Sequence, residues 1–326
     1  MNSLQHEGVK RDAKRGILPG LARLLILLAA LAPLSYAMAK SWRDVRAALT
    51  HVNWSDFVLA QFLLFLVMPL MASISWFTVR RLTGVIGPYQ AIRLYFISQL
   101  PKYLPGGIWA FPGRMLAYQR VGVDRIKSIV SVFREVTALF LGGATIALLG
   151  LSQGLPASGD LRLLLGIGIA GSILVLLLTQ LPWFWRLLSS IRVLRSTALP
   201  MLEIPDQDVS LVWLPSAFVV SCVFWLALGA SFRQLVLAIN PSVSLSWIGA
   251  ASLFSLAWCV GFVVVFVPAG LGIREAALAF LLSRFLPEGD ALAVALLARL
   301  WWMGAEALWI LPSWLWTLGR WGEQTR

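Results

Sequence analysis

The chain contains the stretches Leu104-Pro105-Gly106-Gly107-Ile108 and Val267-Pro268-Ala269-Gly270-Leu271, which interrupt otherwise apolar segments at matching places in its two halves. Proline removes a backbone hydrogen-bond donor and glycine loosens the backbone, so each stretch predicts a break in a helix. Paired breaks of this kind in a duplicated membrane protein indicate a binding site near the middle of the bilayer. These two stretches therefore set the expected fold.

The composition places the chain in a membrane. Of its 326 residues, 59% are hydrophobic and only 13% are charged, which is far more apolar than a soluble domain. The net charge of +12 does not indicate nucleic acid, because the basic residues are spread among apolar spans and form no single basic face. Cys222 and Cys259 lie in apolar runs without metal or disulfide spacing, and we interpret them as small buried side chains.

Apolar runs long enough to cross the hydrocarbon predict six full transmembrane helices. They cover residues 21–39, 57–79, 128–150, 161–181, 212–236 and 290–318. Two further apolar regions, 86–120 and 247–286, carry the breaks and are expected to form broken re-entrant hairpins. The first run has an alternative interpretation as a signal peptide, because a basic leader precedes it and Ala37-Met38-Ala39 ends it.

The basic residues predict the orientation. If both hairpins return to the side from which they enter, most of the 27 Lys and Arg fall on the side of the N-terminus. The positive-inside rule then puts both termini in the cytoplasm, with a basic segment at 1–20, a single membrane domain at 21–318 and a short tail at 319–326. This assignment counts Lys102 among the cytoplasmic charges.

The predicted order of elements repeats. Each half runs span, span, broken hairpin, span, over about 21–150 and about 161–318. Three crossings per half is an odd number, so the second copy is expected to be inverted relative to the first. Arg134 and Arg299 follow Pro105 and Pro268 at similar spacing. The fold class we predict is an all-α polytopic membrane protein with an inverted repeat, the architecture of many secondary transporters.

After each break a new half-helix is expected, beginning near Ile108 and near Leu271. The first amides of such a helix lack partners, and with the helix dipole they form an anion site. Arg114 and Arg274 follow within two turns and suit a phosphate or carboxylate. The alternatives are that Arg114 extends to the cytoplasmic surface and that Arg274 is neutralised by its neighbour Glu275.

Arg134 and Glu135 begin the third predicted span, and Arg299 and Glu306 lie well inside the last one. Charges at membrane depth are costly and usually face a cavity or a partner. Arg299 and Glu306 are two helical turns apart and therefore share one face of the last span, where an interhelical ion pair is the alternative to a substrate contact. Glu135 lies nearer the predicted membrane edge.

No catalytic or cofactor motif is evident. His6 and His51 lie outside the spans, which argues against a histidine metal site or base, and no phosphate-binding loop occurs. Asp206 and Asp208 are an acidic pair in a short polar linker, which we interpret as a solvated turn. We expect no cofactor, no metal site and no enzymatic activity.

At these same residues the chain resembles the lysylphosphatidylglycerol synthase transmembrane family, also called flippase-like domain proteins. The resemblance is carried by Pro105-Gly106-Gly107-Ile108-Trp109 with Gly113-Arg114, by Arg134-Glu135, and by Pro268-Ala269-Gly270-Leu271-Gly272-Ile273-Arg274-Glu275. It covers residues 20 to 318. Family members with a fused soluble domain make lysylphosphatidylglycerol there and move it between leaflets with the membrane part. The sequence here ends at Arg326, so the resemblance implies a stand-alone translocating part.

We therefore expect a multi-pass protein of the bacterial inner membrane that moves an amphiphilic, anionic or glycosylated lipid between leaflets through a central polar cavity. Its expected partners are a membrane lipid or lipid-linked saccharide and anionic headgroups. The candidate substrate-binding residues are Pro105, Gly106, Gly107, Arg114, Arg134, Glu135, Pro268, Gly270, Gly272, Arg274, Glu275, Arg299 and Glu306. The alternatives are a membrane glycosyltransferase or lipid-modifying enzyme, and a scaffold that binds a cytoplasmic glycosyltransferase through the basic segment 183–195.

Overall fold

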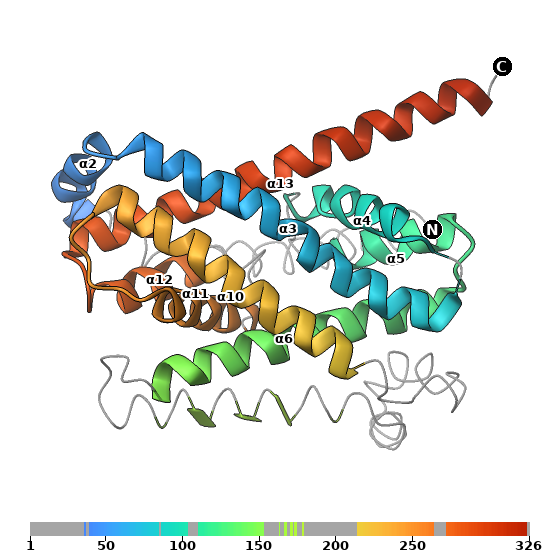
Figure 1. Cartoon of the computed structure of the whole chain (residues 1–326), viewed down its shortest axis with the longest axis horizontal. Helices are drawn as coiled ribbons and strands as arrows, with labels where there is room; N and C mark the ends of the chain where they lie inside the picture. The colour runs from blue at the N-terminus through green and yellow to red at the C-terminus, as the bar shows by residue number, and fades with distance from the viewer. Residues whose placement is uncertain are drawn as a thin grey trace, which may run out of the picture.

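The structure is a computed structural model of the chain. It describes residues 39–84, 86–103, 110–152, 214–263 and 272–324, together with Tyr36 and scattered positions between 163 and 178. These ranges are helical and contain no strand (Figure 1). The elements are α2 (Trp42–Thr50), α3 (Trp54–Thr83), α4 (Pro88–Ile97), the 3-10 helix η1 (Leu100–Tyr103), α5 (Ala110–Arg120), α6 (Arg125–Ser152), α10 (Leu214–Ile239), α11 (Trp247–Val263), α12 (Ile273–Leu282) and α13 (Glu288–Gln324).

In the described part of the chain, four helices are long and apolar enough to cross a membrane: α3, α6, α10 and α13. Each is at least 26 residues long, more than the roughly 20 residues that span the hydrocarbon. They confirm the predicted crossings at 57–79, 128–150, 212–236 and 290–318. The predicted crossings at 21–39 and 161–181 lie mostly outside the described residues.

Polar caps extend two of these helices beyond their predicted limits. The Asn53 side chain accepts a hydrogen bond from the Ser55 amide and starts α3, and Gly84 ends it with a φ of 67°. Before α6, the Asp124 carboxylate accepts from the Ile126 amide at 2.9 Å. As a result, α6 begins at Arg125 and Glu135 lies well inside the helix, deeper than the sequence suggested.

The two interrupted apolar regions each form two helices. Region 86–120 gives α4, η1 and α5, and region 247–286 gives α11 and α12. The residues between them, 104–109 and 264–271, are outside the described part, and so are Pro105, Gly106, Gly107, Pro268 and Gly270. The second helix of the second pair begins at Ile273, two residues later than predicted, and the described part of α5 begins at Ala110.

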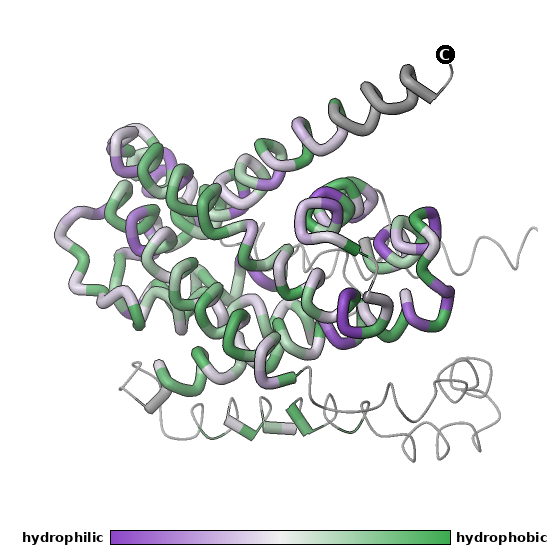
Figure 2. Tube along the Cα trace, turned by 45° about the vertical axis from the view of Figure 1, so that its right-hand side comes forward, coloured by the Kyte–Doolittle hydropathy of each residue, from purple (hydrophilic) through white to green (hydrophobic). Residues whose placement is uncertain are grey.

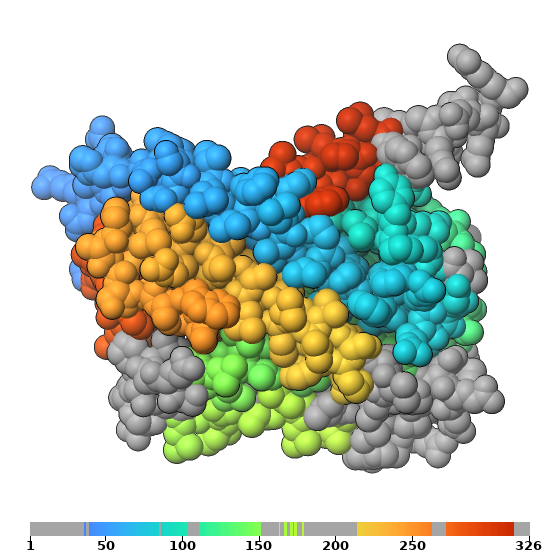
Figure 3. Space-filling model, viewed as in Figure 1, coloured from blue at the N-terminus to red at the C-terminus, as the bar shows by residue number. Residues whose placement is uncertain are grey.

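Helices α3 and α10 run antiparallel, side by side, along one face of the protein (Figures 1 and 3). The Asn53 amide at the start of α3 donates to the Ala238 carbonyl near the end of α10, at 2.8 Å. Deeper in, the Ser231 hydroxyl donates to the Ala60 carbonyl at 2.7 Å. Both bonds join backbone or small side chains, so the two helices approach closely.

Small residues also set the other close contacts. A Cβ at Gly229 of α10 would lie 2.2 Å from the Ala251 side chain of α11, and one at Gly142 of α6 would lie 2.2 Å from the Ser221 hydroxyl of α10. Membrane helices commonly pack in this way, because lipid provides no hydrophobic drive and close backbone approach maximises van der Waals contact. The outward faces carry apolar side chains and the helix ends carry the polar ones (Figure 2).

The helix contacts fall into matching sets. In the first half α3 contacts α4 and α6, and α5 contacts α4 and α6. In the second half α10 contacts α11 and α13, and α12 contacts α11 and α13. Between the halves α6 packs on α11 and α10, while α13 packs on α4 and α3. When α3, α4, α5 and α6 are matched in order with α10, α11, α12 and α13, each of these contacts in one half therefore has a counterpart in the other.

Candidate functional site

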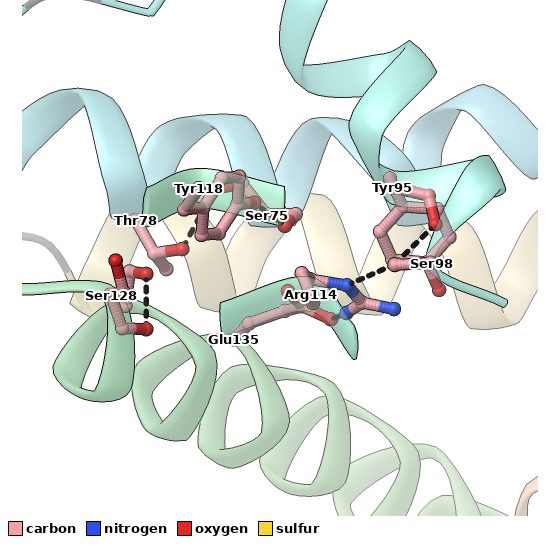
Figure 4. Close-up of polar contacts among 9 residues, drawn as sticks. Ser75, Thr78, Tyr95, Ser98, Arg114, Tyr118, Ser128 and Glu135 are labelled. Atoms are coloured by element: carbon pink, nitrogen blue, oxygen red, sulfur yellow. Dashed lines mark hydrogen bonds and ion pairs between the residues drawn. The ribbon is translucent and has the colours of Figure 1, made fainter. Parts of the chain in front are cut away.

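The most buried ion pair joins Arg114 of α5 to Glu135 of α6 (Figure 4). Their side chains are 2% and 5% exposed. The Arg114 Nε also donates to the Ser98 hydroxyl at 3.0 Å, and its guanidinium lies over the Tyr95 ring, 4.0 Å from the centroid. Arg114 therefore does not extend to the cytoplasmic surface, which excludes that alternative interpretation.

The end of α4 positions this pair. Ser98 follows the last turn of α4, where its hydroxyl contacts the Tyr95 carbonyl at 2.6 Å as well as Arg114. Gly113 lets the turn of α5 that carries Arg114 approach Pro101, because a Cβ there would lie 3.3 Å from the proline ring. One oxygen of Glu135, Oε2, is buried and has no hydrogen-bond partner among the described residues. The arginine thus has three partners, whereas the carboxylate keeps an unused acceptor.

A second cluster surrounds Glu275 at the start of α12. Its Oε1 lies 3.3 Å from Arg299 Nη1 on α13 and 3.7 Å from Arg274 Nε. Its Oε2 accepts from the Gly272 amide at 2.8 Å, and Gly272 has a φ of 82°, a conformation that favours glycine. The prediction of unpartnered amides here is therefore wrong for Gly272, because the carboxylate three residues later satisfies its N–H.

Aromatic faces hold Arg274. Its guanidinium carbon lies 5.6 Å from the ring centroids of Phe254 on α11 and Trp302 on α13. Gly261 of α11 faces the Arg274 side chain, and a Cβ there would lie 3.0 Å from the Arg274 Cβ. Cation–π contacts of this kind keep a buried cation in place without neutralising its charge. Glu275 is shared between Arg274 and Arg299, so the adjacent pair is not simply self-neutralising.

A third ion pair connects the halves. Lys102 of η1 binds Glu306 of α13, and the Trp302 indole donates to the same carboxylate oxygen at 2.8 Å. The sequence placed Lys102 among the cytoplasmic surface charges, but its side chain is only 16% exposed and pairs with a residue 204 positions away. The prediction that Lys102 lies at the surface is therefore wrong, because α4 packs against α13 and brings η1 against the last span.

These clusters form one array. The Trp302 indole donates to Glu306, the partner of Lys102, and its ring lies beside Arg274, so the third pair adjoins the Glu275 cluster. Lys102 lies in η1, which begins two residues after Ser98, the hydroxyl partner of Arg114. The segment from Ser98 to Lys102 therefore connects the first-half pair to the second-half cluster.

Most described candidates come together in this array. Arg299 and Glu306 share a face of α13, and each forms an interhelical ion pair, as the alternative interpretation expected: Arg299 with Glu275, and Glu306 with Lys102. Arg134 is 5% exposed and has a partner of its own. Sequence reasoning missed Lys102, Tyr95, Ser98, Phe254 and Trp302. Only Lys102 had a visible signal, since it lies three residues before Pro105.

The described residues contain no group of three or more His, Cys, Asp or Glu side chains that could hold a metal ion. Long apolar helices packed around a buried array of ion pairs define the protein as a multi-pass α-helical membrane protein.

The family follows from comparison with known proteins. The sequence profile described as "Lysylphosphatidylglycerol synthase TM region" matches residues 20–303, so the chain belongs to this family. No curated protein gave a match. The family assignment relates the protein to lipid handling in the membrane and agrees with the resemblance seen in the sequence.

Proposed function

We propose that this protein moves an amphiphilic lipid with an anionic headgroup between the two leaflets, without chemical change to the lipid. The observation that carries the proposal is the connected ionic array at membrane depth. Ionised side chains in hydrocarbon are expensive and are kept where they contact a polar substrate or a partner. In the proposed cycle the headgroup enters a polar path along the array, and its hydrocarbon tail stays in the bilayer.

The depth of the charges supports this path. Glu135 is ten residues from the first residue of α6, and Arg299 is eleven from the first residue of α13. At about 1.5 Å per residue, each lies about 15 Å from the start of its helix, several residues inside the apolar run. Because α6 and α13 run in opposite directions, the two residues approach the middle from opposite sides (Figure 1).

We further infer that the two halves are inverted repeats with re-entrant hairpins at α4–α5 and α11–α12. The matching helix contacts support this arrangement, and so do the opposite directions of α3 and α10 (Figure 1). Inverted repeats allow alternating access, because the two halves can exchange conformations about a central site. Binding at the breaks themselves, with Pro105 and Pro268, belongs to the same proposal.

The charges at the two ends support a cytoplasmic location for the end that carries the C-terminus of α3 and the N-terminus of α6. Lys127 donates to the Leu82 carbonyl at 3.2 Å, which places these two termini together. That end has Arg80, Arg81, Arg120, Arg125, Lys127 and Arg320 against Asp124 and Glu323 among the described residues. The opposite end carries the acidic residues Asp44, Asp56, Glu288 and Asp290 beside its basic ones. The proposed orientation in the bacterial inner membrane follows the excess of basic residues.

The test is a leaflet-exchange assay with purified protein in phosphatidylcholine vesicles. A tail-labelled anionic phospholipid in the inner leaflet becomes accessible to an external quencher only after it crosses. We expect exchange with the wild type, loss of most of it in Arg114→Gln, and none in protein-free vesicles. Arg43→Gln is the matched control, because Arg43 is an exposed residue of α2. Equal exchange by Arg114→Gln and wild type would contradict the proposal.

A further inference from the structure

Glu135 and Glu275 differ in what their carboxylate oxygens bind. Glu275 uses both oxygens, one for Arg299 and one for the Gly272 amide. In Glu135, Oε1 pairs with Arg114, while Oε2 is buried without a hydrogen-bond partner among the described residues. Glu135 therefore has an open acceptor oxygen at membrane depth.

The guanidinium of Arg114 is held in place by contacts other than Glu135. Its Nε donates to the Ser98 hydroxyl at 3.0 Å, and its guanidinium carbon lies 4.0 Å from the centroid of the Tyr95 ring. Neither contact brings a negative charge, so among the described residues Glu135 is the partner that neutralises Arg114. Arginine binds phosphates and carboxylates in the same two-oxygen geometry. An anionic headgroup can therefore take the place of Glu135 on Arg114.

This exchange leaves a buried negative charge on Glu135. Removing one partner of a buried ion pair is strongly unfavourable, because the other charge stays in a medium of low polarity. A buried carboxylate avoids this cost by taking up a proton. The open Oε2 of Glu135 is the atom that can receive it.

We propose that headgroup binding at Arg114 is coupled to the uptake of one proton by Glu135. This inference rests on the proposed function and names the ion that moves with the lipid. The proton passes from a hydronium ion to Oε2, which forms an O–H bond and leaves water, and no bond of the lipid breaks. The empty site holds a guanidinium and a carboxylate, and the occupied site holds a guanidinium, a singly charged headgroup and a neutral acid. Both states have no net charge.

The ionisable groups nearest to Glu135 already hold their protons. Tyr118 lies one turn after Arg114 on α5, where its hydroxyl bonds to that of Ser75 on α3, and Tyr95 lies under the Arg114 guanidinium. Arg134 precedes Glu135 on α6 and is buried. Near neutral pH a phenol is protonated and a guanidinium stays charged, so none of these groups takes up the proton in place of Glu135.

The other helices packed against α6 offer no second acceptor beside Glu135. Their ionisable side chains are Asp56, Arg80 and Arg81 of α3, Cys222 and Arg233 of α10, and Cys259 of α11. Asp56 is the one carboxylate among them. It lies in the first turn of α3 and accepts from Gln234 at 2.6 Å.

Buried hydroxyls extend from Glu135 toward the start of α6. Ser128, Ser131 and Glu135 share one face of α6, because they are three and four residues apart. Ser75 and Thr78 lie on the neighbouring α3 (Figure 4). All four hydroxyl side chains are fully buried. A hydroxyl both donates and accepts, so with intervening water these groups can pass a proton between Glu135 and this end of the protein.

Calorimetry of purified protein with dihexanoylphosphatidylglycerol measures the coupling directly. The binding heat is recorded at one pH in buffers of different ionisation enthalpy, and its slope gives the protons taken up per headgroup bound. The phosphodiester does not titrate near neutral pH, so any uptake belongs to the protein. We expect about one proton for the wild type and none for Glu135→Gln. Glu288→Gln, the same change at an exposed residue of α13, is the control and should keep the wild-type value.

A second measurement uses the wild type alone and does not depend on the folding of a variant. Tail-labelled phosphatidylglycerol starts in the inner leaflet of phosphatidylcholine vesicles, and a gradient of one pH unit is set in either direction. Exchange should be roughly tenfold faster with the acidic interior, because the side that supplies the lipid then has ten times more protons. A potassium diffusion potential should change neither rate, because one proton and one negative charge cross together.

Four results overturn the inference and leave the proposed function standing. They are binding without proton uptake in the wild type, uptake that persists in Glu135→Gln, exchange that ignores the pH gradient, and exchange that follows the potential. If phosphatidylglycerol neither binds to the wild type nor exchanges in its vesicles, the proposed function fails together with the inference.

Discussion

Glu135 and Arg299 lie at similar distances from the starts of α6 and α13, ten and eleven residues from Arg125 and Glu288, but they carry opposite charges. Each pairs with the short helix that precedes its span: Glu135 with Arg114 of α5, and Arg299 with Glu275 of α12. The same helix-to-helix connection is therefore made twice with the charges exchanged. The two connections hold the short helices against the long spans, and Lys102 with Glu306 joins one half to the other.

Removing one partner of the Arg114–Glu135 ion pair should strongly destabilise the protein. Glu135→Gln leaves the Arg114 charge buried with only Ser98 and Tyr95 beside it, and we expect it to lower the free energy of unfolding by about 3–5 kcal/mol. The double variant Arg114→Met with Glu135→Met removes both charges and should lose less than either single change. Unfolding of detergent-solubilised protein, read as a double-mutant cycle, measures this coupling. Arg81→Gln at an exposed site should stay within about 0.5 kcal/mol of wild type. Strictly additive losses would show that the pair is not coupled.

Exchanging the charges of Lys102 and Glu306 should restore part of the thermal stability that each single substitution removes. Lys102→Glu and Glu306→Lys each place two like charges together, so both should lower thermal stability. The combined variant should recover only in part, because the Trp302 indole now faces an ammonium and cannot donate to it. Adding Trp302→Phe to the exchanged pair should improve the recovery. A combined variant that instead loses as much thermal stability as the sum of the losses in the two single variants would show that Lys102 and Glu306 are not partners.

Because α10 and α11 approach closely, one added methyl group at their contact should lower the stability of the protein. Gly229→Ala puts a Cβ 2.2 Å from the Ala251 side chain and should cost about 1–3 kcal/mol, because the two backbones must move apart. Gly87→Ala is the matched control, since a Cβ at Gly87 meets nothing within 4 Å. The midpoint of thermal unfolding should fall for the first variant and stay unchanged for the second. Equal midpoints would mean that these helices are not in contact at Gly229.

The orientation can be tested by labelling introduced cysteines. In a background of Cys222→Ala and Cys259→Ala, Thr50→Cys lies at the end of α2 on the proposed outer side, and Arg81→Cys lies near the end of α3 on the proposed cytoplasmic side. A membrane-impermeant maleimide added to intact spheroplasts should label Thr50→Cys and not Arg81→Cys. After lysis both should react, which controls for buried thiols. The reverse pattern would invert the proposed orientation.

Local patterns predicted the long helices well. A span must supply enough consecutive apolar residues to cross the hydrocarbon, and that requirement is visible in sequence at α3, α6, α10 and α13. Helix limits were less accurate, because caps such as Asn53 and Asp124 add polar residues outside the apolar run. Both interrupted regions were expected to form paired helices, and α4 with α5 and α11 with α12 bear this out.

The sequence by itself determined that the chain is a multi-pass helical protein and that Arg114, Glu135, Arg299 and Glu306 are charges within its apolar regions, because both properties follow from the cost of placing polar groups in lipid. Only the tertiary structure decided their partners. Lys102 meets Glu306 across 204 residues, and Arg299 takes Glu275 rather than the Glu306 on its own face. Such pairings depend on how α4 and α12 pack against α13, and helix periodicity contains no information about distances between helices that are remote in the chain.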